Sequence, residues 1–241
     1  MLDNSFRPNK VGIPLFMIGA VIGYALFLAT FLQDTEAIVF SALLSGQRTL
    51  TSLSCPEIIT PQEVGTVRAK IHNPTENTQY RSVRTHISQG FLTLIREHYE
   101  HYDLDPGETQ QVSWEVFPED AAYGYVILTK VYLFPQNPLP SYVGACGILM
   151  LDIPFITGWQ FISVVAAASL ILMGIGYRRY VTHNQPLLGK KRSLAVNMVV
   201  IAVTVTLAIG TMFLESWYMG LFFFIFTIIL LAESVFSFSM S

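Results

Sequence analysis

The sequence predicts a membrane protein with four transmembrane α-helices and an extracytoplasmic all-β domain inserted between helix 1 and helix 2. Long uncharged apolar runs, a charged segment between them, and strand-like alternation within that segment lead to this prediction. Only 13% of the residues are charged, whereas about 25% is usual for a soluble domain. Asp34 to Asp152 contains 14 acidic and 7 basic residues, against 3 and 7 in the rest of the chain. The two parts are therefore expected on opposite sides of a bilayer, and the net charge of −3 does not suggest a nucleic-acid binder.

Residues 1–33 are predicted to form a cytoplasmic tail and transmembrane helix 1. The run from Val11 to Leu32 has 22 residues without a charge, enough to cross a hydrocarbon core of about 30 Å at about 1.5 Å per residue. A signal peptide has a shorter apolar region of roughly 7 to 15 residues and a small-residue cleavage site, so a retained anchor is expected. The other predicted transmembrane helices are residues 153–177, 194–214 and 217–241.

The positions of Lys and Arg predict the orientation of these helices, because cytoplasmic loops are enriched in both. The tail contains Arg7 and Lys10. Both termini are therefore expected in the cytoplasm of a multi-pass plasma-membrane protein, with residues about 34–152 outside. The predicted cytoplasmic loop 178–193 supplies further basic side chains, interpreted as topology determinants that could also contact anionic lipid headgroups. These side chains are Arg178, Arg179, Lys190, Lys191 and Arg192.

The membrane-proximal connector, residues 34–49, is open to three interpretations. Its apolar residues could form a short amphipathic helix on the outer membrane surface. They could equally extend helix 1 or form a strand. These apolar residues are Ala37, Ile38, Val39, Ala42, Leu43 and Leu44.

Residues 50–152 are predicted to form short strands separated by turns. Apolar and polar residues alternate over Val67–His72, Val83–Ile87 and Val112–Val116, which is the period of a half-buried strand. Clusters of Pro, Gly, Asn and Asp between the runs supply the turns. Six to eight strands in about 100 residues indicate a two-sheet sandwich. Further strands are predicted at Phe91–Arg96, Tyr123–Phe134 and Tyr142–Leu151.

Three stretches of this domain resemble the immunoglobulin-like and fibronectin-III-like β-sandwich domains of bacterial surface proteins. Leu104–Glu108 followed by Val112–Val116 is similar to their late hairpin. Val67–Pro74 is similar to their early strand, which ends in an Asn-Pro turn. The resemblance covers residues about 50–152 only. It implies a sandwich with a binding or spacer role and carries over no catalytic residue.

Both cysteines, Cys55 and Cys146, lie in this domain. One precedes the first clear strand and the other lies in the last, and in an immunoglobulin-like sandwich these strands can be neighbours. Disulfides persist outside the reducing cytoplasm, so a Cys55–Cys146 disulfide is predicted, with two buried free thiols as the alternative. Closing a loop of about 90 residues could contribute roughly 4 kcal/mol.

The run His98–Asp103 is a candidate metal cluster. On a helix His98 and His101 would share a face, but in a strand residues three apart point to opposite faces. A zinc site needs three or four convergent ligands. An exposed polar strand is therefore the preferred interpretation, and no metal or cofactor is expected.

Two features of the predicted helices are candidates for association. Gly12, Gly19 and Gly23 share a face of helix 1, where small residues allow close approach of another helix from the same chain or from another subunit. Glu233 interrupts the last apolar run, and carboxylates inside a membrane are costly. It either contacts a basic residue of a partner subunit or lies at the cytoplasmic interface where the helix ends.

Recognisable catalytic motifs are missing from the sequence, including the phosphate-binding loop, the dinucleotide fingerprint, HExxH and GxSxG. The leading hypothesis is a non-enzymatic accessory or scaffold subunit of a membrane complex, with the lipid bilayer and membrane-protein subunits as its partners. The first alternative is a receptor or sensor for a small ligand or polysaccharide, with Tyr99, Tyr102, Tyr123 and Tyr125 as the binding surface. The second is a membrane enzyme whose outer-interface site uses the His98–Asp103 cluster.

Overall fold

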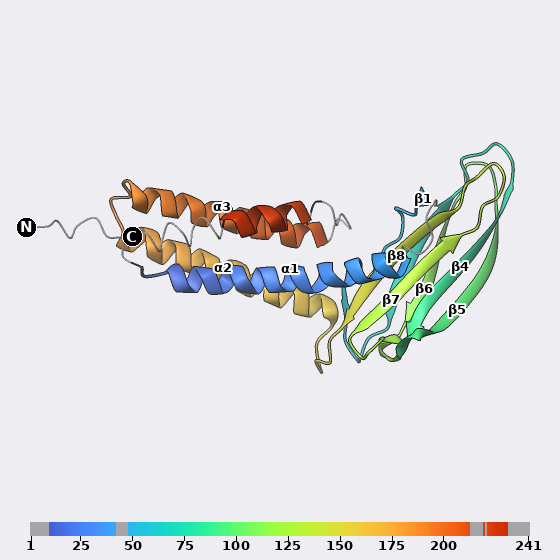
Figure 1. Cartoon of the computed structure of the whole chain (residues 1–241), viewed down its shortest axis with the longest axis horizontal. Coiled ribbons are helices and arrows are strands. Elements are labelled where there is room, and N and C mark those ends of the chain that lie inside the picture. Colours follow the sequence, from blue (N-terminus) through green and yellow to red (C-terminus); the bar gives the residue numbers. More distant parts are fainter. Residues whose placement is uncertain (1–9, 42–47, 213–218, 220, 231–241) are drawn as a thin grey trace, which may run out of the picture. The chain divides into compact units, whose positions relative to one another are not determined.

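The computed structural model describes residues 10–41, 48–212, 219 and 221–230 (Figure 1). The chain divides into a helical unit, Met1–Leu28 with Ile162–Ser241, and a β-rich unit, Ala29–Phe161. Within the described ranges, three helices are long and apolar enough to cross a membrane. In the region of the fourth predicted helix the described part is a shorter apolar helix, Leu221–Leu230, and Glu233 lies outside the described residues. The three long helices are α1 (Ile13–Ser41), α2 (Gly158–His183) and α3 (Lys190–Met212).

The glycines predicted to mediate helix association lie against other helices of the same chain. A Cβ at Gly19 would lie 2.8 Å from the carbonyl oxygen of Ser169 on α2, and one at Gly23 would lie 2.6 Å from Val205 Cγ1 on α3. Gly12 likewise approaches the backbone of α2. The Ser169 hydroxyl also donates a 2.8 Å hydrogen bond to the Gly19 carbonyl. This face of α1 is therefore occupied within the helical unit.

The start of α2 differs from the sequence prediction. The helix begins at Gly158 rather than at residue 153, and a capping box explains the position. Thr157 N–H donates to Gln160 Oε1 at 3.0 Å, and Gln160 N–H donates to Thr157 Oγ1 at 3.3 Å. Each side chain thus satisfies a backbone donor that would otherwise be unpaired at a helix start.

The predicted basic loop 178–193 is shorter than expected, because helices occupy both of its ends. α2 continues through His183, and α3 begins at Lys190, directly after Gly189 with its positive φ of 53°. The linker between the helices is therefore Asn184–Gly189. The basic residues lie in helices rather than in a loop: Arg178 and Arg179 in α2, and Lys190, Lys191 and Arg192 in α3.

The connector between helix 1 and the β domain begins as an extension of that helix. α1 continues without a break to Ser41, and Ala37 is fully buried in a small cluster with β-domain residues. The α1 backbone at Gln33 lies close to Gly147 of the β domain. A Cβ at position 147 would collide with the Gln33 carbonyl, so glycine makes this close approach possible. Residues 42–47 lie outside the described residues. The other members of the cluster are Ala122, Val126, Leu128 and Ala145.

The β-rich unit is a sandwich of a six-stranded and a two-stranded sheet (Figure 1). The larger sheet has the order β1-β8-β7-β4-β5, with β2 also paired to β8, and the smaller sheet pairs β3 with β6. β1 and β2 run parallel to β8, and the other pairs are antiparallel. The strands are β1 (Arg48–Thr49), β2 (Ile58–Ile59), β3 (Gly65–His72), β4 (Gln79–Gln89), β5 (Phe91–Leu104), β6 (Thr109–Val116), β7 (Val126–Leu133) and β8 (Tyr142–Met150).

The predicted alternation places one side of each long strand in a common core. Val67 on β3, Val83 on β4, Trp114 on β6 and Ile148 on β8 are buried in one cluster between the sheets. The predicted alternating runs therefore lie within β3, β4 and β6 as expected. The strand predicted at Phe91–Arg96 is longer, because β5 pairs with β4 along its whole length.

The predicted Asn-Pro turn after β3 is fixed by a buried amide. Asn73 is fully buried, and its Nδ2 donates to the carbonyls of Leu104 at 2.9 Å and Asp105 at 3.1 Å. A third bond from the same nitrogen reaches the Asn77 carbonyl at 2.9 Å. Asn73 thus connects the end of β3 to the end of β5.

Residues Arg48–Ile59, here called the closing segment, contact both sheets. β1 and β2 pair with the two ends of β8, while between them Ser54 exchanges backbone hydrogen bonds of 2.7 and 2.8 Å with Arg68 on β3. Cys55 of this segment forms a disulfide with Cys146 in the middle of β8, with 6.5 Å between their Cα atoms. The predicted disulfide is confirmed, and it fastens the closing segment across the edge of the sandwich.

Candidate interaction surfaces

Five aromatic side chains gather on the outward face of β4, β5 and β7, one of them, Phe134, directly after the last residue of β7. Because β4 pairs with both β5 and β7, outward residues of the three strands become neighbours on one face. The members on different strands are far apart in the sequence, so it is the strand pairing that brings them together. The group, here called the aromatic cluster, consists of Tyr80, Tyr99, His101, Tyr132 and Phe134.

The rings of the aromatic cluster contact one another in a continuous chain. Tyr80 stacks on His101 with ring centroids 5.2 Å apart, and Tyr99 meets the same imidazole edge-on at 4.7 Å. Phe134 contacts Tyr99 at 5.7 Å and Tyr132 at 4.6 Å. Tyr99 remains 53% exposed. The cluster is therefore an ordered apolar surface with polar atoms at its margin, the composition typical of protein interfaces.

A row of charged side chains borders the aromatic cluster. Arg84 on β4 hydrogen-bonds Glu97 on β5, which raises the pKa of Arg84 and lowers the pKa of Glu97. Lys130 on β7 lies opposite His86 on β4, and burial lowers the pKa of Lys130. The row therefore contains the Arg84–Glu97 ion pair and a second, partly buried cation, Lys130.

His86 predicts a pH dependence of stability. Burial lowers its pKa from the ordinary 6.5, and the charges of Arg84 and Lys130 lower it further, while Glu97 acts in the opposite direction. As the pH falls below about 6.5, the unfolded chain therefore takes up a proton before the folded one does, and stability is lost until the lower folded pKa is passed. Thermal unfolding of the full chain between about pH 8 and pH 5 is expected to show this loss.

One substitution tests whether the pH dependence arises from His86. His86→Gln is expected to flatten the acid side of the profile. A His86→Gln variant that retains the full acid loss would contradict the assignment.

The candidate metal cluster His98–Asp103 is divided between the two faces of β5. His101 points outward, where its Nδ1 lies 2.9 Å from Ser82 Oγ, whereas His98 interacts with Asp120 on the other face. Among the described residues, no group of three or more His, Cys, Asp or Glu could hold a metal ion. The geometry agrees with the strand interpretation and gives no support to a metal site in this run.

The four tyrosines considered for a ligand-binding surface do not form one site. Tyr99 belongs to the aromatic cluster, whereas Tyr102 lies against the core and donates its hydroxyl to the Glu100 carboxylate. Tyr123 and Tyr125 stack on each other, with centroids 6.3 Å apart, in the turn before β7. A single ligand therefore has no surface that joins all four residues.

Two buried charged groups were missed by sequence reasoning. Asp120 accepts hydrogen bonds from Arg96 Nη2 at 2.5 Å and from Phe117 N–H at 2.8 Å, yet burial raises the pKa of its carboxyl. Arg81 is 2% exposed, and its Nη2 donates to the Pro140 carbonyl at 3.4 Å. Its Nε and Nη1 have no hydrogen-bond partner within the described ranges, and burial lowers its pKa. Arg81 is separated by even numbers of residues from Val83 and Ile87, which are buried on β4. This spacing was the sequence signal that Arg81 faces inward.

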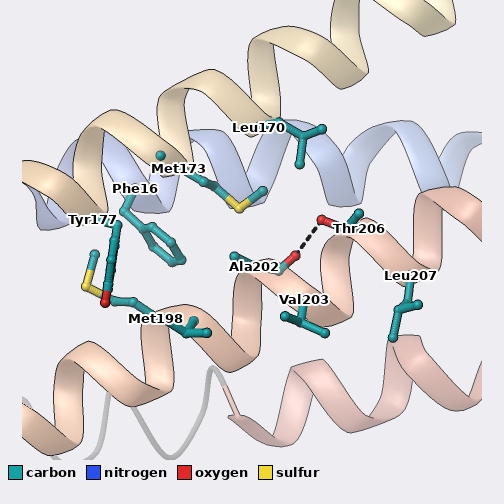
Figure 2. Close-up of a pocket in the computed structure, with 11 residues that line it drawn as sticks. Phe16, Leu170, Met173, Tyr177, Met198, Ala202, Val203, Thr206 and Leu207 are labelled. Atoms are coloured by element: carbon teal, nitrogen blue, oxygen red, sulfur yellow. Dashed lines mark hydrogen bonds between the residues drawn. The ribbon is translucent and has the colours of Figure 1, made fainter.

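The helical unit contains an apolar groove of about 360 Å³ among α1, α2 and α3 (Figure 2). Phe16 of α1, Leu170 of α2 and Leu207 of α3 all line it. Its polar lining groups are the hydroxyls of Tyr177 and Thr206, and the latter donates to a carbonyl of its own helix at 2.7 Å. Such a groove can accept acyl chains or another apolar surface, but it has few groups to select a particular ligand.

Comparison with known proteins assigns the chain to no family. No protein-family model matches it, and no curated protein matches it in sequence. Similar solved structures include the CARDB domain of the PF1109 protein from Pyrococcus furiosus, at 10% identity and a TM-score of 0.34, covering 42% of this chain and 90% of that one. A cycloisomaltooligosaccharide glucanotransferase from Paenibacillus sp. shows 11% identity and a TM-score of 0.33, covering 46% of this chain and 14% of the enzyme. A β-glucosidase from Listeria innocua shows 14% identity and a TM-score of 0.28, covering 40% and 15%.

The chain thus spans only a small part of both enzymes. At these identities and TM-scores the similarities carry no argument about activity, and the description of the sandwich rests on its own strand pairing.

Proposed function

We propose that the chain is a non-enzymatic accessory or scaffold subunit of a membrane complex, and that its sandwich binds a partner subunit through the aromatic cluster. The observation that carries the proposal is the cluster itself, with its contacting rings and the half-exposed Tyr99 beside the Arg84–Glu97 pair. Aromatic residues and Arg are enriched at protein interfaces. Rings already held by their neighbours also lose little conformational entropy on binding.

The proposed topology has four transmembrane helices, both termini in the cytoplasm, and an immunoglobulin-like sandwich outside the plasma membrane. The three apolar helices indicate membrane insertion, and the disulfide indicates an oxidising compartment for the sandwich. Basic residues at the adjoining ends of α2 and α3 support a cytoplasmic position for that linker.

A fourth transmembrane helix is supported by contacts of the short helix Leu221–Leu230. Its Phe224 ring lies 6.2 Å from Tyr24 and 6.1 Å from Phe27, both on α1. Thr227, one turn further, is fully buried. Glu233 remains a proposed contact with a partner subunit.

The partner proposal predicts a specific loss on substitution of Tyr99. Mild detergent extraction of the tagged full chain from native membranes, followed by native gel and mass spectrometry, is expected to recover partner subunits in stoichiometric amounts. Tyr99→Ala is expected to weaken their binding by about thirtyfold or more, the loss of roughly 2 kcal/mol typical of a central aromatic contact. The comparison variant is Tyr123→Ala, because Tyr123 is also 53% exposed but lies outside the aromatic cluster. It is expected to retain the partners.

Two outcomes would contradict the proposal. A wild-type chain that migrates alone would remove the accessory role. Partners retained equally by Tyr99→Ala and Tyr123→Ala would leave the role possible elsewhere on the chain but exclude the aromatic cluster as the binding surface.

A further inference from the structure

Three connections of the sandwich meet at one end of the larger sheet. The register pairs the end of β4 with the start of β5, and the start of β7 with the end of β8. Backbone hydrogen bonds join the connections: Tyr123 N–H donates to the Gly90 carbonyl at 3.0 Å, and Met150 N–H donates to the Tyr125 carbonyl at 2.9 Å. The β4–β5 turn, the turn before β7 and the chain leaving β8 therefore form a single surface, here called the proximal end.

The proximal end presents large apolar side chains to solvent. Phe155, in the chain that follows β8, is 87% exposed, and Tyr123 and Tyr125 are each about half exposed. Leu94 and Ile95, at the start of β5, are exposed as well. These residues come from three separate stretches of sequence, so their convergence is a property of the fold. Exposed apolar side chains gathered in this way mark an interaction surface.

The backbone holds two of these aromatic side chains outward at a conformational cost. Within the described ranges, the non-glycine residues with positive φ are Tyr123, at 55°, and Phe155, at 72°. Tyr123 and Gly124 are the central residues of a turn closed by Tyr125 N–H and the Ala122 carbonyl at 3.3 Å. Such conformations cost bulky residues free energy and persist where the surroundings enforce them. Both strained residues project an aromatic ring from the same end of the sandwich.

The start of α2 is attached to the same end. Glu63, before β3, accepts the backbone N–H of Gly158 with both carboxylate oxygens, at 3.1 and 3.2 Å. The first exposed residue of α2 is Trp159, at 62%. Only two residues separate Phe155 from α2, which is long and apolar enough to cross a membrane.

We propose that the proximal end inserts its aromatic and aliphatic side chains into the lipid headgroup region of the membrane that α2 enters. Tyr and Trp favour this region because each combines an apolar ring with a polar atom. Exposed carboxylates at this end include Asp152, after β8, and Glu119, before β7. They favour zwitterionic over anionic lipid, so apolar contact rather than charge attraction holds the surface to the bilayer. The opposite end of the sheet is instead formed by the polar turns Asp105–Gly107 and Pro135–Pro140.

This inference does not depend on the partner proposed for the aromatic cluster. It concerns a different end of the sandwich and a lipid rather than a protein. The purified chain in lipid nanodiscs, without any partner subunit, is sufficient to test it.

The test places a tryptophan at the proposed depth. Phe155→Trp and Tyr125→Trp are made separately in the full chain carrying Trp159→Phe and Trp217→Phe, and each protein is placed in phosphatidylcholine nanodiscs. Trp114 stays as a constant signal, because it is buried in the core. With lipids brominated on the acyl carbons nearest the headgroup, both introduced tryptophans are expected to lose fluorescence. Their emission is also expected to shift to the blue relative to a water-exposed indole.

The control is Tyr80→Trp in the same background. Tyr80 is exposed to nearly the same extent as Tyr125, but it lies at the opposite end of β4. Its replacement is expected to be quenched by iodide in the buffer and not by brominated lipid. Iodide quenching of Phe155→Trp and Tyr125→Trp at the level of Tyr80→Trp would overturn the proposal. Lipid quenching that appears only after anionic lipid is added would overturn it as well.

Discussion

Replacing Cys55 and Cys146 together by alanine is expected to lower the free energy of unfolding of the sandwich by about 2–5 kcal/mol. The bond joins residues separated by 91 positions, and a loop of this length greatly restricts the unfolded chain. Besides the disulfide, the closing segment is held by the two-residue strands β1 and β2 and by the backbone hydrogen bonds between Ser54 and Arg68. Loss of the bond is therefore expected to release this segment first.

Chemical unfolding of the full chain in detergent, followed by near-ultraviolet circular dichroism, measures this effect. A reducing agent is expected to destabilise the wild-type protein to the same extent and to leave the double variant unchanged. This pair of measurements separates the bond from any effect of the substitutions themselves. Equal stability of the oxidised and reduced wild-type protein would show that the disulfide does not stabilise the fold.

Gly19→Leu and Gly176→Leu are each expected to destabilise the helical unit by about 1–3 kcal/mol, the usual cost of overpacking. A Cβ at Gly176 would lie 2.5 Å from the backbone nitrogen of Phe16, and one at Gly19 would lie 2.8 Å from Met173 N. Backbone atoms of a helix cannot move aside as the end of a side chain can. Costs near the upper end of this range are therefore expected.

Gly174→Leu is the matched control, because it makes the same change on α2 only two residues from Gly176. A Cβ at Gly174 would have no atom within 4 Å, so the same leucine is expected to leave stability unchanged. Titration with sodium dodecyl sulfate, followed by far-ultraviolet circular dichroism, compares the three variants. If Gly19→Leu changed only the oligomeric state and not the stability, its face of α1 would be an interface between chains after all.

The strands could be predicted because one physical signal determines them. Alternation over Val67–His72 and Val112–Val116 requires that one face be buried, and the two runs pair as β3 and β6 in a register that buries both. The helix ends were harder to predict. Hydropathy does not distinguish Ile153 from Gly158 as the first residue of α2, whereas the reciprocal hydrogen bonds of Thr157 and Gln160 do. The Thr-x-x-Gln spacing was visible in the sequence and would have located the start.

The aromatic cluster was not predicted, because its members come from three strands. Within one strand the signal was present: Tyr80, Arg84 and His86 are separated by even numbers of residues and therefore share a face. The pairing of β4 with both β5 and β7 decides which residues lie beside them, and local sequence does not encode that choice. The glycines of α1 show the converse case. Their small side chains were visible in the sequence, but the helices they approach, α2 and α3, could be identified only from the contacts with Ser169 and Val205.

The pairing of the closing segment has a consequence for biogenesis. β1 and β2 both pair with β8, the last strand in the sequence, so neither these pairings nor the Cys55–Cys146 disulfide can form until nearly the whole domain has been synthesised. Pairings between residues so far apart in sequence form late in folding. β8 ends at Met150 and α2 begins at Gly158. The sandwich can therefore be completed, and its disulfide formed, only when synthesis of the chain has nearly reached α2, the second helix long and apolar enough to cross a membrane.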